Sequence, residues 1–159
     1  MKWAESYKYG EKAEQRFASI LPNPIFATTD QNIFEHWDVA NGDVKYDVKG
    51  MKKFRRSDPT PTDRIHYVEL KNVNGKAGWL YGKADYIAFE TRGYWVIVSR
   101  QTLQEFIEHH SPMETSKEPQ IYKLYKRSGR EDLMTVVPTI DLIAIADRMV
   151  RKIVNHDGV

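Results

Sequence analysis

The chain has 159 residues, of which 41% are hydrophobic and 29% are charged, and its formal net charge is +2. This length and composition predict a single globular domain spanning residues 1–159 and exclude a largely disordered chain. The absence of cysteine excludes disulfide frameworks, cysteine-based zinc sites and a thiol nucleophile. Because no apolar segment has the roughly 18 residues that cross a membrane, we expect a cytoplasmic protein without a membrane partner.

The first predicted element is a helix over residues 9–21. Apolar side chains such as Phe17 recur there at helical spacing, and Pro22 stops the helix. Glu14 lies at the edge of the apolar stripe, whereas Glu11 faces more outward. A carboxylate at that edge is either an ordinary boundary residue or a group that points toward a site.

The strongest turn signal follows at Asn41-Gly42. This pair favours a two-residue type I′ hairpin, in which both central residues take positive φ. Residues 33–39 and 44–51 carry the β-branched and aromatic side chains of two paired strands, and residues 23–30 are expected to be a connector.

Asp47 and Lys49 lie two residues apart, so on a strand they share one face, and Val48 points to the other. The hairpin folds Asp38 back toward that face, which predicts two carboxylates and an ammonium in one place. Such a group suits Mg²⁺ (or Mn²⁺), because this ion prefers oxygen ligands and retains several waters. A nearby lysine can orient the attacking water or neutralise charge on a phosphate. The alternative is a solvated hairpin with a weak ion pair.

Residues 52–64 are polar and proline-punctuated, which predicts a loop. Between residues 44 and 83 ten Lys/Arg face four Asp/Glu, so this segment carries +6 and the remainder −4. Basic charge gathered around the predicted site is typical of a nucleic-acid footprint, although a solvated loop accounts for part of it. The candidate nucleic-acid-binding residues are Lys52, Lys53, Arg55, Arg56, Lys71, Lys76, Trp79 and Lys83.

Residues 65–71 form the next predicted strand, which repeats the acid-x-base pattern at Glu69 and Lys71. Two assignments therefore stay open. Either Asp38 works with Asp47 and Lys49, or Asp47 works with Glu69 and Lys71. The short hairpin connection favours the first assignment, with Glu69 as an additional ligand.

Residues 72–83 are rich in glycine, which permits close backbone approach to a ligand. Trp79 lies between cations and is either a platform for stacking bases or a cap on the core. The sequence has no glycine-rich nucleotide-binding motif, so we expect no nucleotide cofactor.

Alternation and helical periodicity define the remaining elements, and no second domain is indicated. We expect strands at 85–90 and 94–99 joined across 91–93 at the centre of the sheet, a helix at 101–110, a hairpin of 121–126 with 133–137, and a last helix from 138 to about 153.

Asp38 followed by Asp47-Val48-Lys49 across a tight hairpin resembles the PD-(D/E)XK nuclease superfamily, in which Trp37 would replace the proline of the motif. The resemblance covers about residues 10–100, and residues 78–87 resemble a block in small, phage-type members. It implies an α+β (α/β) fold: a mixed central β-sheet flanked by helices, with a restriction-endonuclease-like core. The chain departs from the family where residues 72–83 replace a long helix.

The resemblance also implies a function: metal-dependent hydrolysis of DNA phosphodiester bonds, by an endonuclease rather than an exonuclease, in the host cytoplasm if phage-encoded. Glu14, Asp38 and Asp47, with Glu69, would hold the metal, and Lys49 would position the nucleophile. The main alternative is a non-catalytic nucleic-acid-binding protein on the same fold, and a further one is a small interaction protein. A junction resolvase would need a homodimer, for which the sequence shows no clear surface.

Overall fold

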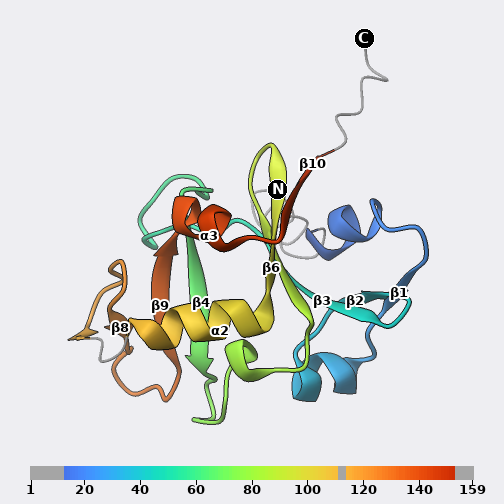
Figure 1. Cartoon of the computed structure of the whole chain (residues 1–159). Coiled ribbons are helices and arrows are strands. Elements are labelled where there is room, and N and C mark those ends of the chain that lie inside the picture. Colours follow the sequence, from blue (N-terminus) through green and yellow to red (C-terminus); the bar gives the residue numbers. More distant parts are fainter. Residues whose placement is uncertain (1–12, 111–113, 153–159) are drawn as a thin grey trace.

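The computed structural model describes residues 13–110 and 114–152 (Figure 1). Within these ranges the strands form a six-stranded sheet, ordered β1-β2-β3-β5-β6-β10, and a four-stranded sheet, ordered β4-β9-β8-β7. The first sheet contains β1 (Pro24–Phe26), β2 (Val39–Asn41), β3 (Val44–Lys49), β5 (Tyr86–Glu90), β6 (Tyr94–Ser99) and β10 (Arg148–Arg151). The second contains β4 (Ile65–Lys71), β7 (Thr115–Ser116), β8 (Leu124–Tyr125) and β9 (Leu133–Pro138).

The helical elements are few. They are the described part of the first helix at 13–18, a π-helical turn η1 (Gln31–Glu35), a 3₁₀ turn η2 (Trp79–Tyr81), α2 (Arg100–His109) and α3 (Thr139–Ile145). None of the helices in the described ranges has the length and apolar character to cross a membrane.

The six-stranded sheet is mixed, because β3 pairs with β5 in parallel while its other strand pairs are antiparallel. The predicted α+β class with a mixed sheet is therefore confirmed. The prediction of one central sheet is wrong, since β4 pairs with β9 in the second sheet. The middle of β5, from Ile87 to Phe89, is apolar and fully buried, as a strand covered on both faces must be, whereas β4 alternates buried and partly exposed residues.

The turn of the β2–β3 hairpin lies one residue later than Asn41-Gly42. Asn41 pairs with Val44, so the central residues are Gly42 and Asp43. Gly42 has φ 61°, whereas Asp43 does not take a positive φ. Glycine at the first central position is the pattern of a type II′ turn rather than type I′.

The predicted strand over 33–39 is also wrong except at its last residue. The segment instead forms η1, whose entry is fixed by reciprocal hydrogen bonds: Gln31 Oε1 accepts from the Thr28 N–H, and Thr28 Oγ1 accepts from the Gln31 N–H. His36 then takes a left-handed conformation, with φ 57°, and redirects the chain into β2. The predicted connector before it contains the edge strand β1, which pairs with β2.

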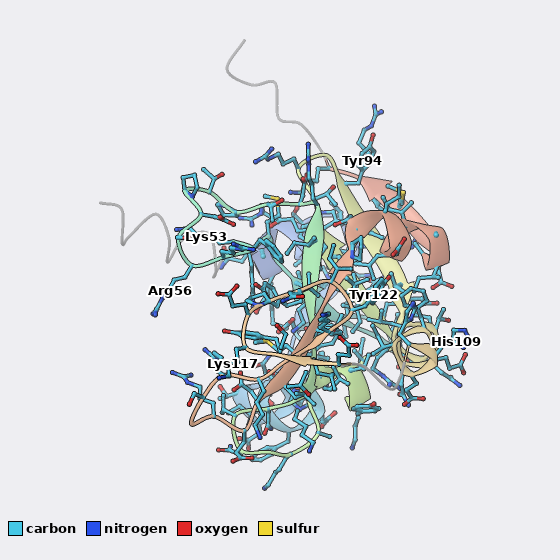
Figure 2. The ribbon with its side chains drawn as sticks, turned by 90° about the vertical axis from the view of Figure 1, so that its left-hand side faces the viewer. Lys53, Arg56, Tyr94, His109, Lys117 and Tyr122 are labelled. Carbon is cyan, nitrogen blue, oxygen red and sulfur yellow. The ribbon has the colours of Figure 1, made fainter. Side chains whose placement is uncertain are left out.

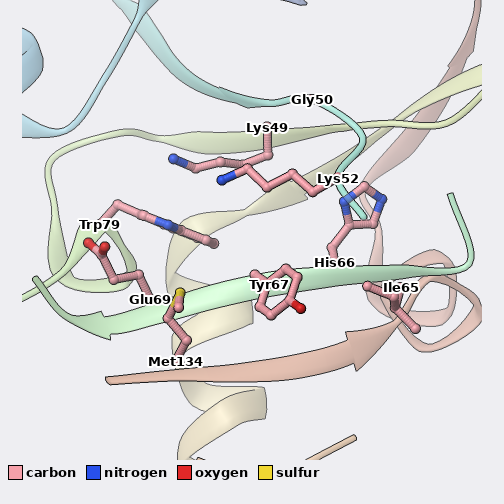
Figure 3. Close-up of a pocket in the computed structure, with 9 residues that line it drawn as sticks. All are labelled: Lys49, Gly50, Lys52, Ile65, His66, Tyr67, Glu69, Trp79 and Met134. Carbon is pink, nitrogen blue, oxygen red and sulfur yellow. The ribbon is translucent and has the colours of Figure 1, made fainter. Parts of the chain in front are cut away.

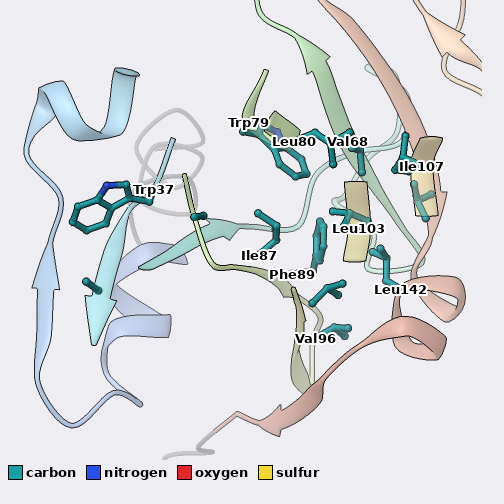
Figure 4. Close-up of a cluster of buried hydrophobic side chains, with 14 residues drawn as sticks. Trp37, Val68, Trp79, Leu80, Ile87, Phe89, Val96, Leu103, Ile107 and Leu142 are labelled. Atoms are coloured by element: carbon teal, nitrogen blue, oxygen red, sulfur yellow. The ribbon is translucent and has the colours of Figure 1, made fainter. Parts of the chain in front are cut away.

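Hydrophobic side chains pack on both faces of the six-stranded sheet. The helix at 13–18 covers one face, where Phe17 lies 5.0 Å from Tyr46 and 5.1 Å from Trp95 between ring centroids. On the other face, Val68 of β4 and Leu103 of α2 pack against the central strands (Figure 4). The sheet thus separates two apolar layers.

The strands predicted at 65–71, 85–90 and 94–99 and the helix predicted at 101–110 correspond to β4, β5, β6 and α2. The predicted last helix is too long. It ends at Ile145, after which the Asp147 N–H donates to the carbonyl of Ile97 and its carboxylate accepts from the Ser99 N–H. These bonds turn the chain into β10, which supplies a partner for the outer edge of β6.

Candidate active site

Asp38 is a buried carboxylate at the start of β2, one residue before the Val39–Tyr46 pair. Its Oδ2 accepts a hydrogen bond of 2.7 Å from the Val48 N–H, and its Oδ1 accepts one of 2.6 Å from Asn32 Nδ2. The hairpin register therefore holds Asp38 next to Asp47 on β3. A fixed carboxylate of this kind is a rigid point from which a site can be built.

Asp47 is 3% exposed, and its Oδ1 lies 2.9 Å from Lys49 Nζ. Its Oδ2 is buried and has no hydrogen-bond partner in the described residues. Burial raises the pKa of Asp47 to about 8, since the Lys49 ammonium, which lowers the pKa, only partly compensates and the charge of Asp38 raises it further. A buried oxygen without a donor is the place where a cation would contribute most.

Glu14 approaches the same place from the first helix. Burial raises the pKa of Glu14 to about 7, and the nearby Asp38 carboxylate raises it as well, while Lys49 acts in the opposite direction. Asp38 thus lies between two carboxyl groups that both favour a proton when no cation is present. Glu11, the alternative on this helix, lies outside the described residues.

These side chains line one open pocket of about 300 Å³. Its lining comprises Glu14, Asn32, His36, Asp38, Asp47, Val48, Lys49, Glu69 and Trp79. Glu69 therefore reaches the pocket from the second sheet. Lys71 is exposed at the end of β4 and does not line this pocket, so the geometry favours the pairing of Asp47 with Lys49.

Gly78 and Gly82 allow the backbone to pack against the walls of this pocket. A Cβ at Gly78 would lie 2.5 Å from the carbonyl oxygen of Glu69, and one at Gly82 would lie 2.7 Å from the Cβ of His36. The close approach predicted for this segment is thus made to the protein itself. It holds η2 against β4 and η1.

Asn32 and His36 are site residues that the sequence did not reveal. Asn32 lies in η1 and donates a hydrogen bond to Asp38, and His36 is the left-handed residue that follows η1 and lines the pocket. Most of η1 was expected to be a strand. The one local signal is His36 itself, because histidine is among the residues enriched at positive φ.

Of the two roles predicted for Trp79, the structure fits the cap on the core and not the nucleic-acid contact. It is 7% exposed in the core, and the ammonium of Lys49 lies 4.6 Å from the centroid of its ring. A base cannot stack on a ring that is covered in this way. Trp79 instead packs beside Phe89 and orients Lys49 over the pocket.

The other predicted nucleic-acid residues fall into two groups. Lys52, Lys53, Arg55 and Arg56 line a separate hollow beside β4. Lys71, Lys76 and Lys83 are exposed and do not line the carboxylate pocket. Lys52 also extends beside Lys49 toward Trp79 (Figure 3), and the pKa of Lys52 is lowered by desolvation and by the Lys49 charge.

The pocket presents carboxylate oxygens, which are the ligands that Mg²⁺ and Mn²⁺ prefer. Glu14, Asp38, Asp47 and Glu69 are the residues that could hold such an ion. Among the residues that the structure describes, however, no three His, Cys, Asp or Glu side chains stand close enough together to form a ready-made metal cluster. Both oxygens of Asp38 are already hydrogen-bonded, so the unpartnered Oδ2 of Asp47 is the best single ligand.

Comparison with known proteins gives no further identification: no family model, no curated protein and no solved structure matches the chain.

Proposed function

We propose that this chain is a metal-dependent nuclease that hydrolyses DNA phosphodiester bonds, acting as an endonuclease on a restriction-endonuclease-like core of the PD-(D/E)XK type. One observation supports this most directly. Asp38, Asp47 and Lys49 of one hairpin line the same pocket as Glu14 of the first helix. Acids and a lysine from separate elements converge there, at a place where two pKa values are raised, which is typical of functional sites.

In this proposal Glu14, Asp38 and Asp47, with Glu69, hold one or two Mg²⁺ or Mn²⁺ ions. A metal held there would supply Lewis-acid chemistry, which would lower the pKa of a water and neutralise charge on the phosphate. Asp47 and Glu14 would release their protons on binding a cation, so metal binding at this site would depend on pH.

Lys49 donates hydrogen bonds at this site. Its ammonium is held between the Asp47 carboxylate at 2.9 Å and the ring of Trp79 at 4.6 Å. From this position it orients the attacking water or donates to a non-bridging phosphate oxygen, where charge develops in the transition state.

The test is a cleavage panel of supercoiled, linear duplex, single-stranded and four-way-junction DNA in Mg²⁺ or Mn²⁺. We expect wild-type cleavage that EDTA abolishes, and loss of cleavage in Asp47→Asn and Lys49→Ala. The matched controls are Asp43→Asn in the turn and Lys45→Ala on the same strand, which should both cut normally.

Two outcomes would redirect this proposal. If Asp47→Asn and Lys49→Ala cut at the wild-type rate while Glu69→Gln is inactive, the functional pair is on β4. If all three variants cut normally, the site is elsewhere.

A non-catalytic nucleic-acid-binding protein is the second candidate. It is favoured by the finding that the described residues contain no ready-made cluster of metal ligands. DNA binding that survives EDTA, with no nicking in either metal, selects this function.

A further inference from the structure

A large hollow of about 840 Å³ lies beside β4, away from the carboxylates. We call it the basic groove. One wall is the loop after β3, with Lys53, Arg55 and Arg56, and the opposite wall is the β8–β9 connection, with Arg127 and Arg130. Lys53 and Arg56 lie along one side of the molecule (Figure 2). The sequence predicted only the first wall, since the second comes from a segment about 70 residues later in the chain.

The groove is strongly cationic. Six Lys and Arg side chains line it, against a single carboxylate, Glu118. Arg127 is neutralised by the buried Asp132 at 2.5 Å, but in the described ranges the other five cations have no carboxylate within ion-pair distance. Clustered cations without protein partners are the footprint of a polyanion.

The groove connects to the candidate active site through shared side chains. Lys52, Tyr67 and Met134 line both the groove and a smaller pocket of about 150 Å³ (Figure 3). Lys49, Glu69 and Trp79 line both that smaller pocket and the carboxylate pocket. Through these shared side chains, the three hollows follow one another from Arg130 to Asp47.

The aromatic side chains that line the groove match a single strand better than a duplex. Tyr67 of β4, Tyr125 of β8 and Met134 of β9 lie between the cationic walls. Tyr67 donates a hydrogen bond from its hydroxyl to the carbonyl of Phe54, which fixes the first wall against the sheet. A duplex presents phosphates outward and keeps its bases stacked inside, whereas a single strand offers bases to aromatic side chains and phosphates to cations.

We propose that the basic groove binds a single-stranded segment of DNA and leads it to the carboxylate pocket, with phosphates on Arg55, Arg56 and Arg130 and bases against Tyr67 and Tyr125. The direction of this path rests on the proposed nuclease function. The binding itself does not. The substrate class is therefore DNA with a single-stranded stretch, such as a flap, gap or overhang.

The test measures fluorescence anisotropy of a labelled single-stranded oligonucleotide in EDTA, so that binding is read without cleavage. We expect Arg130→Glu to weaken binding and to lower the slope of log affinity against log salt by about one phosphate contact. Tyr125→Ala should weaken binding on the order of tenfold with an unchanged salt slope, because stacking on one aromatic ring is lost. The matched control is Arg151→Glu on β10, which makes the same charge change on the other sheet and should bind as wild type.

Variants that lose the fold are recognised by thermal melting, and the exposed Arg56→Glu then replaces them. Wild-type affinity in Arg130→Glu, Arg56→Glu and Tyr125→Ala would overturn the proposal. It is also overturned by equal affinity for a blunt duplex, by displacement with polyglutamate at equal charge, or by tighter binding of RNA of the same sequence.

The same variants separate the two proposals. Normal binding without cleavage in Mg²⁺ contradicts the nuclease and supports the groove. Cleavage of single-stranded DNA that Arg130→Glu and Tyr125→Ala leave unchanged contradicts the groove and supports the nuclease.

Discussion

Two buried carboxylates on neighbouring strands of the six-stranded sheet, Glu90 at the end of β5 and Asp47 on β3, differ in how many donors face them. Glu90 is 1% exposed and accepts two hydrogen bonds from Arg16, at 2.7 and 2.9 Å, and one from Lys152 at 2.8 Å. Asp47 is nearly as buried, but it has one ammonium and one oxygen without a partner.

The two pKa values move in opposite directions. Burial alone would raise the pKa of Glu90, but hydrogen bonds and charge from Arg16 and Lys152 outweigh burial and lower it. For Asp47 burial dominates and raises the pKa to about 8. Two equally buried carboxylates can therefore differ in kind. One whose charge is compensated is a structural ion pair, and one whose charge is not compensated has the raised pKa that is typical of functional sites.

The first helix contributes side chains both to the Glu90 site and to the carboxylate pocket that contains Asp47. Arg16 binds Glu90, and Glu14, on the same helix, reaches toward Asp38. The compensated site therefore fixes the helix that supplies a side chain to the uncompensated one.

The largest expected difference is in catalysis. If the chain is the proposed nuclease, Asp47→Asn should reduce DNA cleavage on the order of 10³-fold, because it removes the proposed metal ligand. Glu90→Gln should cut within about tenfold of wild type, since Glu90 acts only through the position of the helix. Initial rates on one substrate in Mg²⁺ check both. Loss of cleavage in Glu90→Gln with full cleavage in Asp47→Asn would reverse the roles of the two acids.

The free energy of unfolding should show the opposite order, with the larger effect at Glu90 and the smaller one at Asp47. Glu90→Gln should lower the free energy of unfolding by about 2–3 kcal/mol, somewhat less than a fully buried pair because the Arg16 side chain is 34% exposed. Asp47→Asn should leave it unchanged or raise it, as a disfavoured buried charge is removed. Urea denaturation in EDTA measures both, and a larger loss in Asp47→Asn contradicts the comparison.

Mg²⁺ should stabilise the folded protein through the Asp47 site and not through Glu90. At about 100 times its Kd, Mg²⁺ raises the free energy of unfolding by about 2.7 kcal/mol when it binds the folded state alone. We expect this gain in the wild type and in Glu90→Gln, reversed by EDTA, and its absence in Asp47→Asn. Thermal melting with and without Mg²⁺ measures it, with Ca²⁺ as a comparison ion. An equal gain in Asp47→Asn would place the ion elsewhere.

The smallest expected step is the change in the free energy of unfolding per pH unit in metal-free protein. The pKa of Asp47 is about 8 when folded and close to 3.8 when unfolded, so its contribution is full below pH 3.8 and is lost as the pH rises through 8. The wild type should therefore lose stability relative to Asp47→Asn over that range, by at most about 1.4 kcal/mol per pH unit.

The contribution of Glu90 to the pH dependence of stability has the opposite sign. Because its pKa lies below the ordinary 4.5, its contribution is full above pH 4.5 and is lost at lower pH. The stability difference between the wild type and Glu90→Gln should thus shrink as the solution is acidified. Urea midpoints from pH 3 to pH 9 measure both slopes, and parallel curves for wild type and Asp47→Asn would contradict the prediction.

The sequence by itself determined the elements whose signals are local. Alternation at 65–71, apolar runs at 85–90 and 94–99, and helical spacing at 101–110 each identify their element to within a residue at its ends, because a side-chain period needs no distant partner. The same local rule put Asp47 and Lys49 on one face, and the turn signal returned Asp38 toward that face. The turn itself lies at Gly42-Asp43 rather than Asn41-Gly42, which shifts the pairing by two residues and brings Asp38 beside Asp47.

Tertiary structure alone decided the features that depend on distant partners. Residues 148–151 have helical periodicity, yet they form a strand because β6 has a free edge to pair. Likewise β4 joins a second sheet, which brings Glu69 to the pocket and creates the floor of the basic groove. Hydrogen-bond partners many residues away made these choices, and no local pattern encodes them.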